Sequence, residues 1–176
     1  AALQLNLALK DYRSKDALNI PEASVELQGS RMHHTVAAYA RIMQDEQHLS
    51  GHPGEEAIGE FTLKANGGLS DPAQGWQALQ WRGVLDELAA QGVLPFHLLT
   101  AVPLSFAKDS FILGTADVSI AGGQIQFSDT QWTPQRWHSA GRFSGLNVRA
   151  VNMQQNKFVS DAFDSMRLGG TWKATA

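Results

Sequence analysis

Apolar and polar residues alternate along most of the chain. Every odd position from 3 to 9 is leucine, whereas Gln4, Asn6 and Lys10 occupy even positions. A period of two residues is that of a β-strand with one buried and one solvated face. The same period returns in these later segments: 23–28, 35–42, 57–65, 79–86, 104–106, 111–113, 116–120, 125–127, 137–151 and 171–176. The pattern predicts an all-β protein of consecutive long strands.

Turn-forming residues lie between the alternating segments. The glycine pairs Gly67-Gly68, Gly122-Gly123 and Gly169-Gly170 are expected to form turns between strands, the second of them closing a short hairpin. The polar segment 44–56 carries two glycines and a proline. We expect it to be a flexible loop.

In two segments, a helix is an alternative to a strand. Over 72–91, Asp71 could cap a helix that begins at Pro72. However, Gly75 and Gly83 would each cost about 1 kcal/mol there, so a strand is favoured. Segment 152–167 is less periodic, and one short helix is possible in it.

Composition narrows the class of protein. The 176 residues are 43% hydrophobic, which suits one domain over the whole chain, 1–176. With 14 Lys plus Arg against 17 Asp plus Glu and no basic run, no nucleic-acid partner is expected. The absence of cysteine excludes disulfides and thiolate metal sites, and no apolar run is long enough for a membrane-spanning helix. Because the chain opens with Ala1-Ala2, without Met or a signal peptide, we expect a piece of a longer protein.

An internal similarity appears when the chain is compared with itself at an offset of 58 positions. Segment 83–88 then lies over 141–146, and each has a glycine first, an apolar residue two positions later and a leucine five positions later. Repeated β-meanders of this kind indicate units that stack side by side in an extended array.

The sequence offers little catalytic or metal-binding chemistry. His48 and His52 have the spacing of helical metal ligands, and His33-His34 are near, but the residues around His52 favour a turn. The neighbours Asp86 and Glu87 are expected to face opposite sides of a strand. No nucleophile elbow, zinc-protease or phosphate-loop motif occurs. We therefore expect no enzyme activity, no metal and no cofactor.

Tryptophan is frequent for this length, with five residues. On one exposed sheet face, Trp76, Trp81 and Trp137 would form a sugar-binding platform, so a carbohydrate-binding β-sandwich is an alternative. Trp132 and Trp172 are the other two, and tryptophans in strands also pack in cores.

Together, the alternating strands are expected to form a sheet with one continuous apolar face. Such a face must be covered by closure, by a second sheet or by an apolar ligand. Small residues within it, such as Ala38, Ala40 and Gly59, leave space. An incompletely filled face is what a lipid-holding groove requires.

The order of these motifs resembles the repeating unit of TamB-like proteins, in the AsmA-like (bridge-like lipid transfer) envelope family. The resemblance covers about residues 25–146, and another unit starts at 168–173. It is carried by these segments: Val25-Glu26-Leu27-Gln28-Gly29-Ser30, His33-His34-Thr35-Val36, 76–88, Pro103-Leu104-Ser105-Phe106, Ala121-Gly122-Gly123-Gln124-Ile125-Gln126-Phe127 and 137–146.

The resemblance implies a long curved antiparallel sheet, shaped like a taco or gutter, with a hydrophobic concave groove. It implies a periplasmic location, a parent protein anchored in the inner membrane, phospholipid as cargo and a TamA-like outer-membrane barrel as partner. Nascent outer-membrane proteins docking at the groove or a sheet edge are an alternative. The expected lining residues are Leu3, Leu5, Leu7, Val25, Leu27, Val36, Ala38, Ala40, Phe61, Leu63, Leu85, Leu104, Phe106, Val118, Ile120, Ile125 and Phe127.

Overall fold

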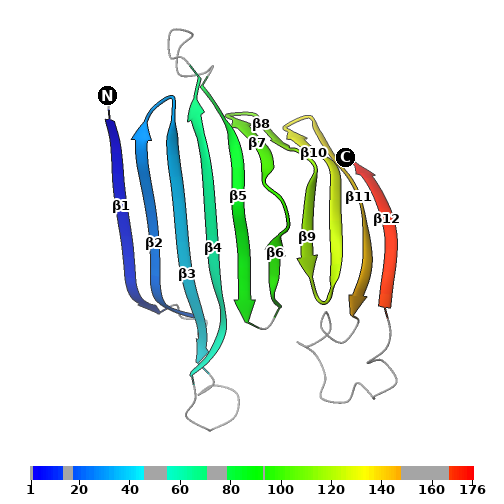
Figure 1. The fold of residues 1–176 in the computed structure, drawn as a ribbon, viewed down its shortest axis with the longest axis horizontal. Helices are drawn as coiled ribbons and strands as arrows, with labels where there is room; N and C mark the ends of the chain where they lie inside the picture. The colour runs from blue at the N-terminus through cyan, green and yellow to red at the C-terminus, as the bar shows by residue number, and fades with distance from the viewer. Residues whose placement is uncertain (1, 14–17, 46–54, 71–78, 93, 148–166) are drawn as a thin grey trace.

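The computed structural model describes residues 2–13, 18–45, 55–70, 79–92, 94–147 and 167–176. These residues form one antiparallel sheet and contain no helix, which confirms the predicted all-β fold (Figure 1). The strands are β1 (Ala2–Arg13), β2 (Leu18–Ser30), β3 (His34–Asp45), β4 (Glu55–Leu69), β5 (Gln80–Gly92), β6 (Phe96–Leu98), β7 (Val102–Ala107), β8 (Ser110–Leu113), β9 (Ala116–Ile120), β10 (Gly123–Thr133), β11 (Arg136–Asn147) and β12 (Arg167–Thr175). The possible helix at 152–167 falls almost entirely outside the described residues.

The sheet is an up-and-down meander in which sequence neighbours pair. Strands β6 and β7 follow the same edge of β5 one after the other, and β8 and β9 do so along β10 (Figure 1). Each pair therefore acts as one long strand with a short interruption. Hydrogen bonds from Leu99 N to Asp117 O and from Gly114 N to Pro103 O, both 2.8 Å, connect the two interruptions across the sheet.

Two of the three predicted glycine turns are wrong. Gly67-Gly68 lies inside β4, and Gly169-Gly170 lies inside β12. At Gly67 and Gly170, glycine is explained by close approach rather than chain reversal, because a Cβ would lie 2.6 Å from the Trp81 ring and 2.9 Å from the Phe143 ring, respectively. The remaining predicted turn, at Gly122-Gly123, is present one residue earlier. It lies at Ala121-Gly122, where both φ angles are positive (51° and 73°), as a tight hairpin requires.

The predicted loop 44–56 is shorter at both ends than expected. Gln44 pairs with Glu56, and Asp45 pairs with Glu55, so both strands run further and only 46–54 lies outside the described residues. The strand interpretation of 79–91 is confirmed by β5, whereas 71–78 is outside the described part of the chain.

The polar face of the sheet carries charges that alternate in sign from strand to strand. Lys10 pairs with Glu22, Glu22 with Arg41, and Arg41 with Glu60. Arg41 Nε lies 3.8 Å from the Glu60 carboxylate. Each such cross-strand pair contributes about 0.2–1 kcal/mol. Because slipping by one residue would exchange the two faces, the row also helps to fix the register.

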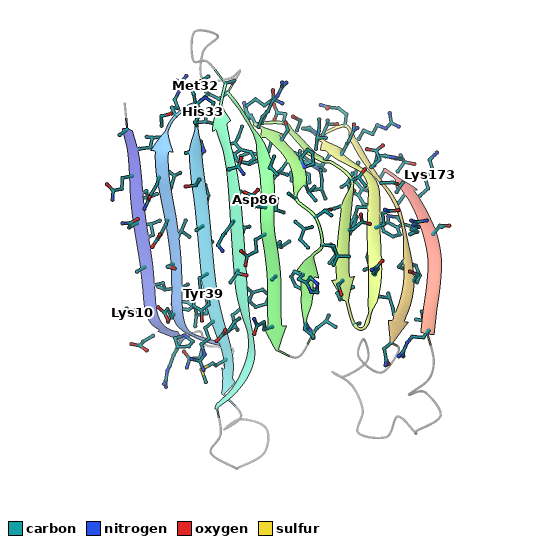
Figure 2. The ribbon with its side chains drawn as sticks, viewed as in Figure 1. Lys10, Met32, His33, Tyr39, Asp86 and Lys173 are labelled. Carbon is teal, nitrogen blue, oxygen red and sulfur yellow. The ribbon has the colours of Figure 1, made fainter. Side chains whose placement is uncertain are left out.

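Asp86 and Glu87 face the same side of the sheet, which corrects the prediction that they face opposite sides. The register shifts between Lys64 and Ala65, so that Lys64 pairs with Glu87 and Ala65 with Leu85. Asp86 accepts a hydrogen bond from Asn66 Nδ2 (2.6 Å), and Glu87 accepts one from Lys64 Nζ (2.6 Å). A β-bulge at Asp86, which Figure 2 labels, places both carboxylates on the polar face.

We expect Glu87→Gln to reduce the acid sensitivity of the fold. Hydrogen bonds from Lys64 and Thr62 hold the pKa of Glu87 below its ordinary value. Since the folded state favours the ionised form, this contribution is complete above the ordinary pKa and is lost as the pH falls through the lowered one. Urea unfolding at a series of pH values should show wild type and variant converging in acid.

The matched control is Glu26→Gln on the same face. Within the described residues, the structure gives Glu26 no hydrogen bond or ion pair, so its variant should follow the wild-type pH profile. Parallel profiles for wild type and Glu87→Gln through the acid range would contradict the role given to Glu87.

Candidate functional site: the apolar face of the sheet

All of the predicted lining residues lie on one face, called here the apolar face. The register connects them from strand to strand: Leu7 pairs with Val25, Val25 with Ala38, Ala38 with Leu63, and Leu63 with Leu88. The other strands continue the face through pairs such as Leu85 with Val102, Leu104 with Leu113, Val118 with Ile125, and Ala116 with Phe127. The alternation is thus continuous across the whole sheet.

The apolar face is open at its β1 side and packed at its centre. Leu7 in β1 is 55% exposed, whereas Val102 in β7 is 0% exposed. The central cluster combines small and large residues, all buried: Ala65, Trp81, Leu85, Val102 and Ala116. Partly buried hydrophobic side chains pack against them: Leu63, Leu69, Leu88, Leu98, Leu104, Leu113 and Phe127. Large neighbours therefore cover small ones within a single layer.

Trp81 is the largest side chain of the central cluster, and a ring stack and a hydrogen bond fix its position. The ring stacks on Phe106 with centroids 5.1 Å apart. Trp81 Nε1 donates to His34 Nε2 (2.9 Å), and His34 Nδ1 lies 3.0 Å from the Ser30 carbonyl oxygen. Because a carbonyl only accepts, His34 carries its proton on Nδ1 and leaves Nε2 free to accept. Sequence reasoning missed this pair, since its members are 47 residues apart.

Glycines make room for the tryptophan rings of this face. Trp81 lies over Gly67 and Gly83, and Trp172 lies over Gly141, where a Cβ would collide with the rings. Trp172 Nε1 donates to Ser139 Oγ (3.1 Å). Gly83 and Gly141 are the residues that the offset of 58 positions superimposes. The internal similarity therefore has a structural counterpart, a glycine beneath an indole.

Of the described tryptophans proposed as a sugar platform, Trp81 is not exposed on the sheet face. Trp81 is 6% exposed and its indole nitrogen is already hydrogen-bonded, whereas Trp137 is 40% exposed and pairs with Trp132 at a hairpin end. Trp76 lies outside the described residues. The described strands belong to one sheet, without the second layer that a sandwich needs.

The described part of the chain contains no group of three His, Asp or Glu residues placed to hold a metal. His34 is buried and His33 is exposed, while His48 and His52 lie outside it. In the same residues there is no helix long and apolar enough to cross a membrane. No family model, curated protein or solved structure matches the chain.

Proposed function

We propose that this chain is a segment of a TamB-like protein of the bacterial envelope. Its apolar face would form a groove that shields phospholipid acyl chains during transport between the inner and outer membranes, and it would support outer-membrane protein assembly. The role is conduction without catalysis or cofactor. The proposed location is the periplasm, with a parent protein anchored in the inner membrane and a TamA-like barrel as partner.

The observation that supports this proposal is a single sheet with one continuous apolar face. In the described residues no second layer covers that face, and large side chains remain exposed along it, including Leu5, Leu7, Phe61 and Phe106. The opposite face carries cross-strand charge pairs and meets water. Each acyl methylene buried on the apolar face contributes about 0.8 kcal/mol, so one chain can be held without chemical recognition.

Leu7→Asp is the variant that tests this function with the least effect on folding. Leu63 and Phe127 pack against the central cluster, so a charge there would also disturb folding. Leu7 is 55% exposed and accepts a charge without such loss. We expect at least a tenfold reduction in co-purified phospholipid, since losing contact with two methylenes costs about 1.6 kcal/mol. Native mass spectrometry with lipid extraction measures the amount.

The control is Ala8→Asp, which adds the same charge to the same strand on the polar face. We expect it to retain lipid at the wild-type level, and urea unfolding should show both variants folded. A folded wild type that carries no lipid and ignores added lipid, or equal losses in the two variants, would contradict the proposed groove.

A second candidate function is docking of a nascent outer-membrane strand at a sheet edge. Among the described strands, β1 and β12 each have one neighbour, which leaves a row of backbone groups on their outer sides (Figure 1). An extended segment can add to such an edge by backbone hydrogen bonds. Crosslinks from β1 to unfolded barrel proteins rather than to lipid would favour this function.

A further inference from the structure

We propose that a hollow at one end of the sheet binds a phosphate group. The hollow measures about 520 Å³ and is lined by Met32, His33, Gly67, Gly68, Leu69, Ser70, Gln80 and Arg82. It lies where β4 ends and β5 begins, beside the turn between β2 and β3. Met32 and His33 mark this end of the sheet in Figure 2. We call it the end hollow.

The wall of the end hollow is held in place by backbone contacts. Within the β2–β3 turn, Ser30 N donates to His33 O (2.6 Å) and His33 N donates to Ser30 Oγ (3.1 Å). Leu69 N donates to Arg31 O (2.9 Å), which fastens the turn to β4. The Met32 backbone lies so close to Gly68 that no Cβ fits there. The hollow is therefore preformed.

The charge of the end hollow favours an anion. Arg82 is exposed, and no hydrogen bond or ion pair joins its guanidinium to any residue that the structure describes. His33 also lines the hollow; its ring is likewise without a described partner, and it supplies a further N–H donor. No carboxylate is among the lining residues that the structure describes. Asp86, four residues further along β5, accepts a hydrogen bond from Asn66, and it is neither a lining residue nor joined to Arg82 by an ion pair.

The chemistry of these side chains points to phosphate. A guanidinium presents a planar fork of N–H donors that matches two oxygens of one phosphate. An imidazole N–H adds a third donor from the facing turn. A phosphate monoester or diester therefore satisfies groups that otherwise have only water as a partner.

The end hollow extends the proposed function. The part of the inference that assigns the bound phosphate to a phospholipid rests on that proposed function. Arg82 follows Trp81, whose ring lies on the apolar face, so only the backbone of β5 separates the two sides. The apolar face and the side that carries Arg82 adjoin each other at the strand ends. A phospholipid with its acyl chains on the apolar face could place its phosphate in the hollow, and a free phosphate ester would use the same donors.

The site itself is tested with soluble glycerol 3-phosphate and inorganic phosphate, titrated into the chain by calorimetry and ³¹P NMR. We expect saturable binding that Arg82→Gln weakens about ten- to a hundredfold, the loss of a charge-assisted hydrogen-bonded pair. The control Arg142→Gln removes the same charge from the polar face of β11 and should leave the affinity unchanged. His33→Ala provides a second variant should Arg82→Gln not fold.

Absence of saturable phosphate binding in the wild type, or equal losses in Arg82→Gln and Arg142→Gln, would overturn the site.

A lipid measurement separates the two ligand sources. It compares retention of phospholipid with retention of diacylglycerol of the same acyl chains. If Arg82→Gln lowers retention of phospholipid alone, the ligand is a lipid headgroup. If phosphate esters bind while neither lipid is retained, the site stands as one for free esters and the proposed function fails. If both lipids are retained and phosphate esters do not bind, only the site fails.

Discussion

Replacing Trp81 with alanine is expected to lower the free energy of unfolding by about 3–5 kcal/mol, as for other large buried aromatic residues. Its ring fills the centre of the apolar face, stacks on Phe106 and lies over two glycines. No second sheet exists in the described residues to close over the cavity. The variant also leaves His34 Nε2 buried without its donor.

Urea denaturation followed by circular dichroism measures this loss. Trp137→Ala is the control, because Trp137 is 40% exposed at a hairpin end and should cost no more than about 1 kcal/mol. Trp81→Phe separates the two contributions, since it keeps an aromatic ring but removes the indole N–H, at an expected cost of about 1–3 kcal/mol. Similar losses in Trp81→Ala and Trp137→Ala would show that the centre is not packed as described.

Gly83→Val is expected to destabilise the sheet by at least about 3 kcal/mol or to prevent folding. A Cβ at this position would collide with the Asn66 carbonyl oxygen of the neighbouring strand and with the Trp81 ring. Valine is otherwise a favourable residue in strands. Any loss therefore reports the close approach and not an intrinsic preference of the backbone.

Gly169→Val is the matched control for this substitution. Gly169 also lies within a strand, but the nearest atom to its Cβ position, Phe143 O, is at an ordinary contact distance of 3.4 Å. We expect a change within about 1 kcal/mol, in the stabilising direction if strand preference dominates. The same urea measurement serves both variants. Equal behaviour of the two would mean that Gly83 has no special role beneath Trp81.

The structure also changes which residues are useful for testing the lipid proposal. Leu7 and Leu63 have the same parity in the alternation and the same face in the sheet, yet Leu7 is 55% exposed whereas Leu63 is partly buried. A sequence pattern assigns a residue to a face, but exposure depends on which large side chains stand beside it on other strands. The same holds for the end hollow, whose Arg82 and His33 come from β5 and from the β2–β3 turn, which are distant in sequence.

The sequence by itself determined the strand class and the face of every predicted lining residue. Side chains alternate with a period of two, and strands that pair in sequence order carry that period from one to the next. Only the tertiary structure decided features that depend on a neighbouring strand. Gly67 and Gly170 resemble turn residues locally, but pairing keeps them in strands, where glycine leaves room for the rings of Trp81 and Phe143 beside their Cβ positions. The bulge that turns Asp86 to the polar face is likewise set by pairing with β4, which no local pattern records.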